Sequence, residues 1–148
     1  MNCNLSGVLV LCERSGRWAD SLRRHGLCES LRLIETRSLI ETEDRLRETP
    51  RALIGIELTA TTTENVTDWL GRRSARLDAK ATLVFAERGL RVCELLCREA
   101  GAVQFIDSEL ELFALTGLFD RYLSDSAFAK LDAGELPLAE RIRASLPW

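Results

Sequence analysis

Short apolar runs alternate along the chain with stretches in which apolar residues recur every three or four positions. The runs predict five strands, at residues 8–12, 31–35, 52–58, 82–86 and 102–106. The first, third and fourth runs are almost continuously apolar, which is typical of parallel strands that are covered on both faces. The second run is more mixed and suits a strand at the edge of a sheet.

The stretches between the runs carry clear signals for helix starts and ends. A capping box, in which Ser or Thr is followed three residues later by Glu, occurs at Ser38, Thr61 and Ser108. The ends of the first, second and fourth helices are predicted by Gly26, Pro50 and Gly101. His25, beside Gly26, is expected to cap the first helix at its C-terminal end.

Strict alternation of strands and helices predicts an α/β fold, because each return to a parallel strand needs a crossover. Right-handed crossovers favour a three-layer sandwich with a five-stranded parallel sheet of order 2-1-3-4-5 and helices on both faces. This domain is expected to cover residues 1–124, and residues 125–148 are expected to form a short C-terminal helical appendage. The appendage would fold over the core or dock on a partner.

Composition narrows the classes of function. The chain has 148 residues, of which 46% are hydrophobic, and a net charge of −3 without a basic stripe, so nucleic acid is not expected as a partner. No apolar run approaches the length of a membrane span, and the run near the start is too short for a signal peptide, so a cytoplasmic protein is expected. Cys93 and Cys97 share a helical face, but with one histidine in the chain they predict core packing and neither a metal nor a cofactor.

Chemistry in a parallel sheet of this kind gathers beyond the carboxyl ends of the strands. The residues predicted there are Cys12, Glu13, Glu57, Glu87 and Asp107. Together with the chain length, the alternation of elements and the Gly101-Ala102 step before the last strand, this organisation resembles a response-regulator receiver domain. The resemblance covers roughly residues 7–124. It implies an acidic pair after strand one, a phospho-accepting Asp ending strand three, a Ser or Thr after strand four and a Lys after strand five.

The chain departs from that receiver pattern at every one of these positions. Cys12-Glu13 replaces the acidic pair, Glu57 replaces the acceptor Asp, Ala86-Glu87 replaces the hydroxyl residue, and Asp107 or Ser108 stands near the lysine position. A hard cation wants several oxygen ligands, and in-line attack depends on geometry that a longer side chain changes. We therefore expect a pseudo-receiver without phosphoryl transfer that signals or regulates through protein–protein contacts. Glu57 would be either a mimic of a phosphorylated aspartate or a solvated acid.

Cys12 supports an alternative function, that of a small enzyme. Low-molecular-weight tyrosine phosphatases and the phosphocarrier subunits of sugar transport systems also place a cysteine after the first strand. The phosphatase pattern has five residues between its Cys and Arg, whereas four residues separate Cys12 from Arg17 here. A loop that cradles phosphate with backbone amides tolerates such a deletion poorly, so packing at the end of a buried strand is the favoured interpretation of Cys12.

The predicted fifth helix has two apolar faces where a surface helix needs one. One face holds Leu110, Phe113, Ala114, Gly117 and Leu118; the other holds Leu112, Leu115, Phe119 and Tyr122. The second face is expected to be an interface, covered either by the apolar stripe of the appendage (Leu138, Ile142 and Leu146) or by another chain. Because receivers commonly pair through this region, the resemblance implies a homodimer through the fourth and fifth helices.

Overall fold

The computed structural model describes residues 7–29, 31–49, 52–75 and 81–124, with the backbone alone at 120 and 122–124. Its strands are β1 (Gly7–Cys12), β2 (Leu31–Thr36), β3 (Ala52–Leu58), β4 (Thr82–Ala86) and β5 (Gln104–Ile106). Its helices are α1 (Arg17–Arg24), α2 (Leu39–Glu48), α3 (Thr63–Ser74), α4 (Glu94–Glu99) and α5 (Phe113–Ser124). Two short 3-10 helices, η1 (Arg91–Cys93) and η2 (Glu109–Leu112), precede α4 and α5.

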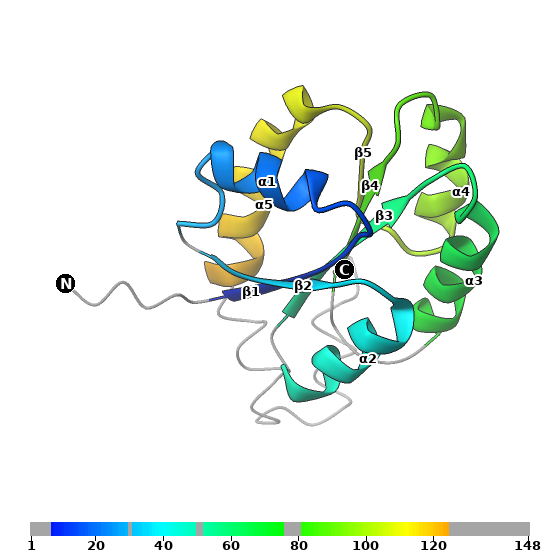
Figure 1. The fold of residues 1–148 in the computed structure, drawn as a ribbon, viewed down its shortest axis with the longest axis horizontal. Coiled ribbons are helices and arrows are strands. Elements are labelled where there is room, and N and C mark those ends of the chain that lie inside the picture. Colours follow the sequence, from blue (N-terminus) through cyan, green and yellow to red (C-terminus); the bar gives the residue numbers. More distant parts are fainter. Residues whose placement is uncertain (1–6, 30, 50–51, 76–80, 125–148) are drawn as a thin grey trace, which may run out of the picture.

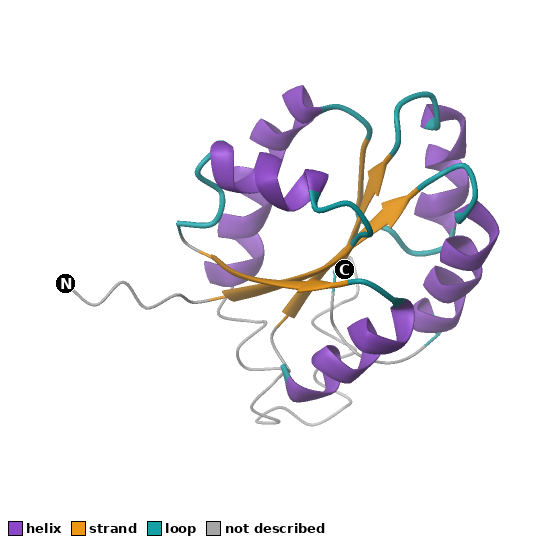
Figure 2. Ribbon diagram, viewed as in Figure 1, coloured by secondary structure: helices purple, strands orange, loops and turns teal. Residues whose placement is uncertain are grey.

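The described strands form one parallel sheet in the order β2-β1-β3-β4-β5, as the sequence predicts. Helices α1 and α5 cover one face of this sheet, and α2, α3 and α4 cover the other (Figures 1 and 2). The predicted α/β three-layer sandwich is therefore confirmed. The predicted appendage, with Leu138, Ile142 and Leu146, lies outside the described residues. No helix of the described part is long and apolar enough to span a bilayer.

Helices α1 and α4 end at the glycines that the sequence predicts as their ends. Gly26 and Gly101 have positive φ angles of 70° and 115°, which cost a glycine little. Around each of them the backbone closes a Schellman motif: the Leu27 amide donates to the Leu22 carbonyl, and the Ala102 amide donates to the Cys97 carbonyl. Because Ala102 is used in this turn, β5 begins at Gln104, two residues later than expected.

The helix starts agree with the sequence at two of three predicted capping boxes. The Ser38 hydroxyl accepts a hydrogen bond from the Glu41 amide, and Ser108 caps η2 by accepting from the Leu110 amide. The prediction at Thr61 was wrong, since α3 begins at Thr63. There, the Thr62 hydroxyl accepts from the Thr59 amide and closes a turn after β3 in place of a cap.

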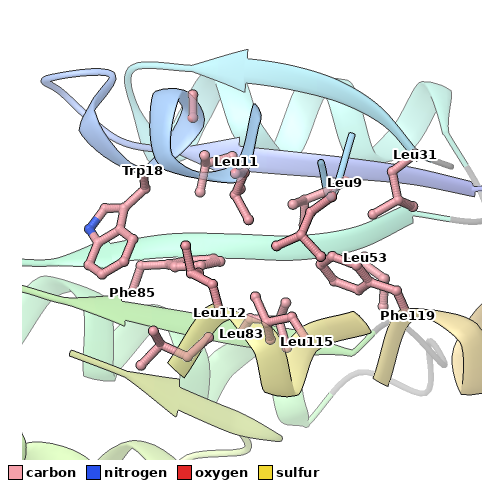
Figure 3. Packing of buried hydrophobic residues seen from close by; sticks show 14 of the residues in the cluster. Leu9, Leu11, Trp18, Leu31, Leu53, Leu83, Phe85, Leu112, Leu115 and Phe119 are labelled. Carbon is pink, nitrogen blue, oxygen red and sulfur yellow. The ribbon is translucent and has the colours of Figure 1, made fainter. Parts of the chain in front are cut away.

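Apolar side chains fill both faces of the sheet. Figure 3 shows one cluster, in which residues of β1, β3 and β4 pack against Trp18 of α1 and against α5. A second cluster joins the opposite face of the sheet to α2, α3 and α4. Gly55 leaves room for the Phe85 ring over β3, because a Cβ at this position would lie 2.8 Å from that ring. The sheet is thus covered on both faces, as its apolar strands predict.

The predicted interface on α5 needs a correction. Leu112, Leu115 and Phe119 are fully buried in the first core cluster of this chain, so they cannot offer a surface to a partner (Figure 3). The opposite face is the exposed one, and Leu110 and Phe113 are its large apolar residues. A helix that packs on a sheet buries one apolar stripe. Here the buried stripe is the one that the sequence analysis assigned to an interface.

Candidate functional site

Strand register brings two of the predicted site residues to the same level. Cys12 of β1 pairs with Ile56 of β3, so Glu13, just after β1, and Glu57, near the end of β3, lie at the same level on neighbouring strands. The sheet order reverses between β1 and β3, which makes this edge the topological switch point where α/β proteins bind ligands. The structure therefore brings these two acids together at the edge of the sheet where the sequence predicts a receiver-like pocket.

Glu13 is turned inward, and its side chain caps helix α1. It is 1% exposed, and its two carboxylate oxygens accept hydrogen bonds of 2.9 Å from the amides of Trp18 and Ala19. Helix α1 needs this contact because Gly16, at its N-cap position, offers no side chain to the first amides. The negative charge also lies at the positive end of the helix dipole.

The environment of Glu13 acts on its proton affinity in two directions. Burial raises the pKa of the carboxyl above its ordinary value of 4.5, and the amides of Ala19 and Trp18 partly offset this by stabilising the charged form. The neighbouring charges of Glu57 and Glu35 raise the pKa further. The Glu13 carboxylate is thus buried, and the hydrogen bonds by which it caps α1 offset part of the free-energy cost of burying its charge.

Glu57 and Glu87 each reach the backbone of a neighbouring loop. Glu57 accepts a hydrogen bond of 3.3 Å from the Arg14 amide in the β1–α1 loop. Glu87 accepts one of 3.2 Å from the Ala60 amide in the β3–α3 loop. Together with Glu13, these contacts tie successive loops at the carboxyl edge of the sheet through carboxylate–amide hydrogen bonds. Glu57 is half-buried and held, which differs from a freely solvated acid.

Asp107 does not join these glutamates. The Arg91 guanidinium donates to both of its oxygens, with distances of 2.6 Å and 3.2 Å. Arg91 also pairs with Glu94 of α4 and with Glu111 of η2. The predicted acidic group is therefore divided: Glu57 and Glu87 line one cleft with Arg14, and Asp107 belongs to an ion-pair cluster beside β5.

Cys12 lies at the end of β1 in an apolar setting. Its side chain is 8% exposed and belongs to the second core cluster with Val10 and Ile56. It also lines a cavity between α2 and α3, which the sequence did not reveal. The packing that the sequence favours for Cys12 is confirmed.

The sequence analysis also did not predict a polar bridge between α2 and α3. Glu43 accepts hydrogen bonds of 3.0 Å from the Trp69 indole and 2.9 Å from Arg73, whose side chain is 6% exposed. Trp69 and Arg73 are four residues apart and share a helical face, which is the one signal the sequence holds. The partner, Glu43, lies on another helix, and no local pattern points to it.

The divalent cation that a receiver-like fold implies does not fit these residues. A hard cation needs several oxygen ligands, but both oxygens of Glu13 already accept amide hydrogen bonds, and Cys12 offers sulfur in an apolar cluster. Within the described ranges, no three His, Cys, Asp or Glu side chains are grouped as metal ligands. We therefore derive no metal-dependent step at this edge.

Comparisons with known proteins agree with the fold. No family model and no curated protein matches the sequence. Among solved structures, the chain is similar to a CheY-like protein (TadZ) from Pseudomonas aeruginosa PAO1, with a TM-score of 0.62 and 20% sequence identity. The similarity covers 78% of this chain and 92% of that one. The chain therefore has a CheY-like fold, which agrees with the predicted α/β architecture.

Proposed function

We propose that this chain is a cytoplasmic receiver-like signalling module that works through protein contacts and transfers no phosphoryl group. The orientation of Glu13 carries this proposal. The one acid that remains of the receiver's acidic pair is committed to the first amides of α1, so it is not available to neutralise a phosphoryl group through a cation. Carboxylate–amide contacts hold the edge of the sheet in one arrangement instead.

The other positions of the edge support the same proposal. Glu57 is hydrogen-bonded to the Arg14 amide, and the neighbouring strand β4 is followed by Glu87, which has no hydroxyl group. Beyond β5 the charged group is Asp107, and Arg91 pairs with it from outside the cleft. An acyl phosphate on Glu57 would therefore meet carboxylates where a receiver offers a hydroxyl and an ammonium group. In the described part of the chain, no hydroxyl or lysine side chain stands at these two positions, so we propose that Glu57 is not a phosphoaspartate mimic.

We predict that the chain is not labelled by a small phosphodonor. After incubation with acetyl phosphate and Mg²⁺, intact-mass spectrometry is expected to show no added phosphoryl group on the wild type. Glu57→Asp is expected to stay unlabelled as well, because Glu13 remains bound to the amides of α1. Phosphoryl transfer that depends on Mg²⁺ and is lost in Glu57→Gln would contradict the proposal.

The same contacts argue against a Cys12 enzyme. A phosphate loop presents the free amides of a helix start to the anion, but here the carboxylate of Glu13 accepts from those of Trp18 and Ala19. The Arg14 amide donates to Glu57. The anion position next to Cys12 is thus taken by the chain's own carboxylates, and we propose that Cys12 has no nucleophilic role.

Exposed apolar residues suggest where protein contacts form. Val92, Leu95 and Leu96 of η1 and α4 are exposed, Leu95 by 68%. Arg91 holds this segment to η2 through its contacts with Glu111 and Asp107, so the two are positioned together. We propose that a second copy of this chain pairs through the α4 face, as the receiver resemblance implies.

A charge on α4 is expected to weaken that pairing. Leu95→Asp should lower the fraction of dimer measured by light scattering after size-exclusion chromatography, because it would bury an unpaired carboxylate. Ile40→Asp is the matched control, since Ile40 is also a large exposed apolar residue but lies on α2. A monomeric wild type, or equal effects of the two variants, would contradict pairing through α4.

A further inference from the structure

A cavity of about 550 Å³ opens between α2 and α3 where β1 and β3 end. The first turn of α2 forms one wall, with Leu39 and Ile40, and α3 forms the other, with Val66 and Trp69. The ends of the two strands lie against it at Cys12, Ile56 and their neighbours. The cavity thus lies at the switch point of the sheet, where ligands of α/β proteins bind.

The interior of this cavity suits a small organic molecule. Its volume lies within the range of small-molecule sites, which are mostly apolar with a few polar groups. The Val66 and Trp69 side chains and the Cys12 thiol contribute apolar surface, and Ile40 is 79% exposed beside it. Binding of an apolar group in this cavity would bury both that group and the exposed Ile40 side chain.

The charges around the cavity favour an anionic head group. Each of its three acids accepts a hydrogen bond from this chain: Glu43 from Trp69 and Arg73, Glu13 from the amides of α1, and Glu57 from the Arg14 amide. In contrast, Arg14 and Arg72 are exposed and line the cavity, and neither forms an ion pair with the part of the chain that the structure describes. A ligand carboxylate, sulfonate or phosphate would find two cations at the rim whose charge is not neutralised.

We propose that this cavity binds a small amphipathic organic anion, with the apolar body between α2 and α3 and the anionic group at the arginine rim. Such a ligand would contact α2, α3 and the strand ends together. It would also lie next to the carboxylate–amide contacts, since Glu13 and Glu57 line the same cavity. This inference does not depend on whether the chain transfers phosphoryl groups or forms a dimer.

A pair of dyes tests the proposal on the full chain. The sulfonated dye 1-anilinonaphthalene-8-sulfonate carries an aromatic body and an anionic group, and N-phenyl-1-naphthylamine is the same body without the charge. We expect the sulfonated dye to bind at one saturable site. Arg72→Glu should weaken its binding about fivefold, the effect of a charge pair near a surface, and should change the binding of the neutral dye by less than about twofold.

Variants at the wall locate the site. Asn65 is exposed on α3 and lines the cavity, so Asn65→Trp should fill the opening and abolish binding of both dyes, while Asn65→Ala should preserve it. Arg32→Glu is the matched charge reversal outside the cavity, since Arg32 is also an exposed arginine, and it should leave both affinities unchanged. Circular dichroism establishes that each variant is folded. The proposal is overturned by the absence of saturable binding, by equal weakening of the sulfonated dye in Arg32→Glu and Arg72→Glu, or by equal weakening of both dyes in Arg72→Glu.

Cysteine alkylation supplies an independent reading of the same site. Cys12 lines the cavity, whereas Cys28 is partly buried against the other face of the sheet. A saturating concentration of the sulfonated dye is expected to slow alkylation of Cys12 by iodoacetamide at least about threefold and to leave the rate at Cys28 unchanged, as a bound ligand protects only what it covers. Equal rates at Cys12 with and without dye would place the dye elsewhere and overturn the proposal.

Discussion

Replacing Glu43 by Ala is expected to lower the free energy of unfolding by about 3 kcal/mol, because the buried Arg73 loses this ion pair and the Trp69 indole loses its hydrogen-bond acceptor. Glu43 joins α2 to α3 by accepting hydrogen bonds from the Trp69 indole and from Arg73. The Arg73 side chain is almost wholly buried, so solvent cannot replace the lost carboxylate. The indole would lose its acceptor at the same time. Urea denaturation followed by tryptophan fluorescence measures the effect.

The next residue of α2 provides the control. Asp44 pairs with Arg47 at 3.1 Å, but both side chains are exposed, so Asp44→Ala should cost no more than about 0.5 kcal/mol. Glu43→Leu combined with Arg73→Met should recover part of the loss, because a well-packed apolar pair does not need the ion pair that Glu43→Ala removes. If Glu43→Ala and Asp44→Ala had equally small effects, the bridge would not stabilise the packing of α2 against α3.

The fold could be predicted from the sequence because its signals are local. Apolar runs separated by amphipathic stretches define four crossovers between five strands, and a parallel sheet of this size leaves few alternatives for the strand order. Gly26 and Gly101 mark the helix ends because a positive φ angle costs glycine little conformational free energy. Each of these signals is contained within one element and its immediate flanks.

The orientation of α5 could not be predicted in the same way. Its sequence offers two apolar faces of similar strength, and the choice between them depends on how the helix docks on the sheet. In the structure the face with Leu112, Leu115 and Phe119 is buried, and Leu110 and Phe113 are left in solvent. Helix periodicity identifies faces, but only packing assigns one of them to the core.

The position of the site could be predicted from the sequence, but the hydrogen bonds within it could not. Strand register follows from the fold, so Glu13 and Glu57 could be placed side by side from the sequence. That Glu13 turns towards α1 depends on Gly16, which leaves the helix start without a side-chain cap. The bridge from Glu43 to Arg73 spans two helices and 30 residues, and a pair of this kind has no local signature.

Removing the Glu13 carboxylate has the second-largest effect that we expect. Glu13→Ala should lower the free energy of unfolding by about 2 kcal/mol, because two buried amides at the start of α1 lose their acceptors. Glu57→Ala and Glu87→Ala are the controls, since each carboxylate accepts one longer amide hydrogen bond and is more exposed. Their effects should stay below about 1 kcal/mol. Equal losses in all three variants would contradict the capping role of Glu13.

The pH dependence of the Glu13→Gln variant separates the charge of Glu13 from its shape. The pKa of Glu13 is raised in the folded chain, so its proton contributes stability below pH 4.5, and this contribution is lost as pH rises through the raised pKa. Gln fills the same space and does not titrate, but its amino group cannot accept from the second amide of α1. Because Gln does not titrate, the gap between the wild type and Glu13→Gln in free energy of unfolding reports the ionisation of Glu13, and by urea denaturation it should decrease as pH rises through the raised pKa. A gap that widens with pH would mean that the amides of Trp18 and Ala19 stabilise the carboxylate by more than burial costs it.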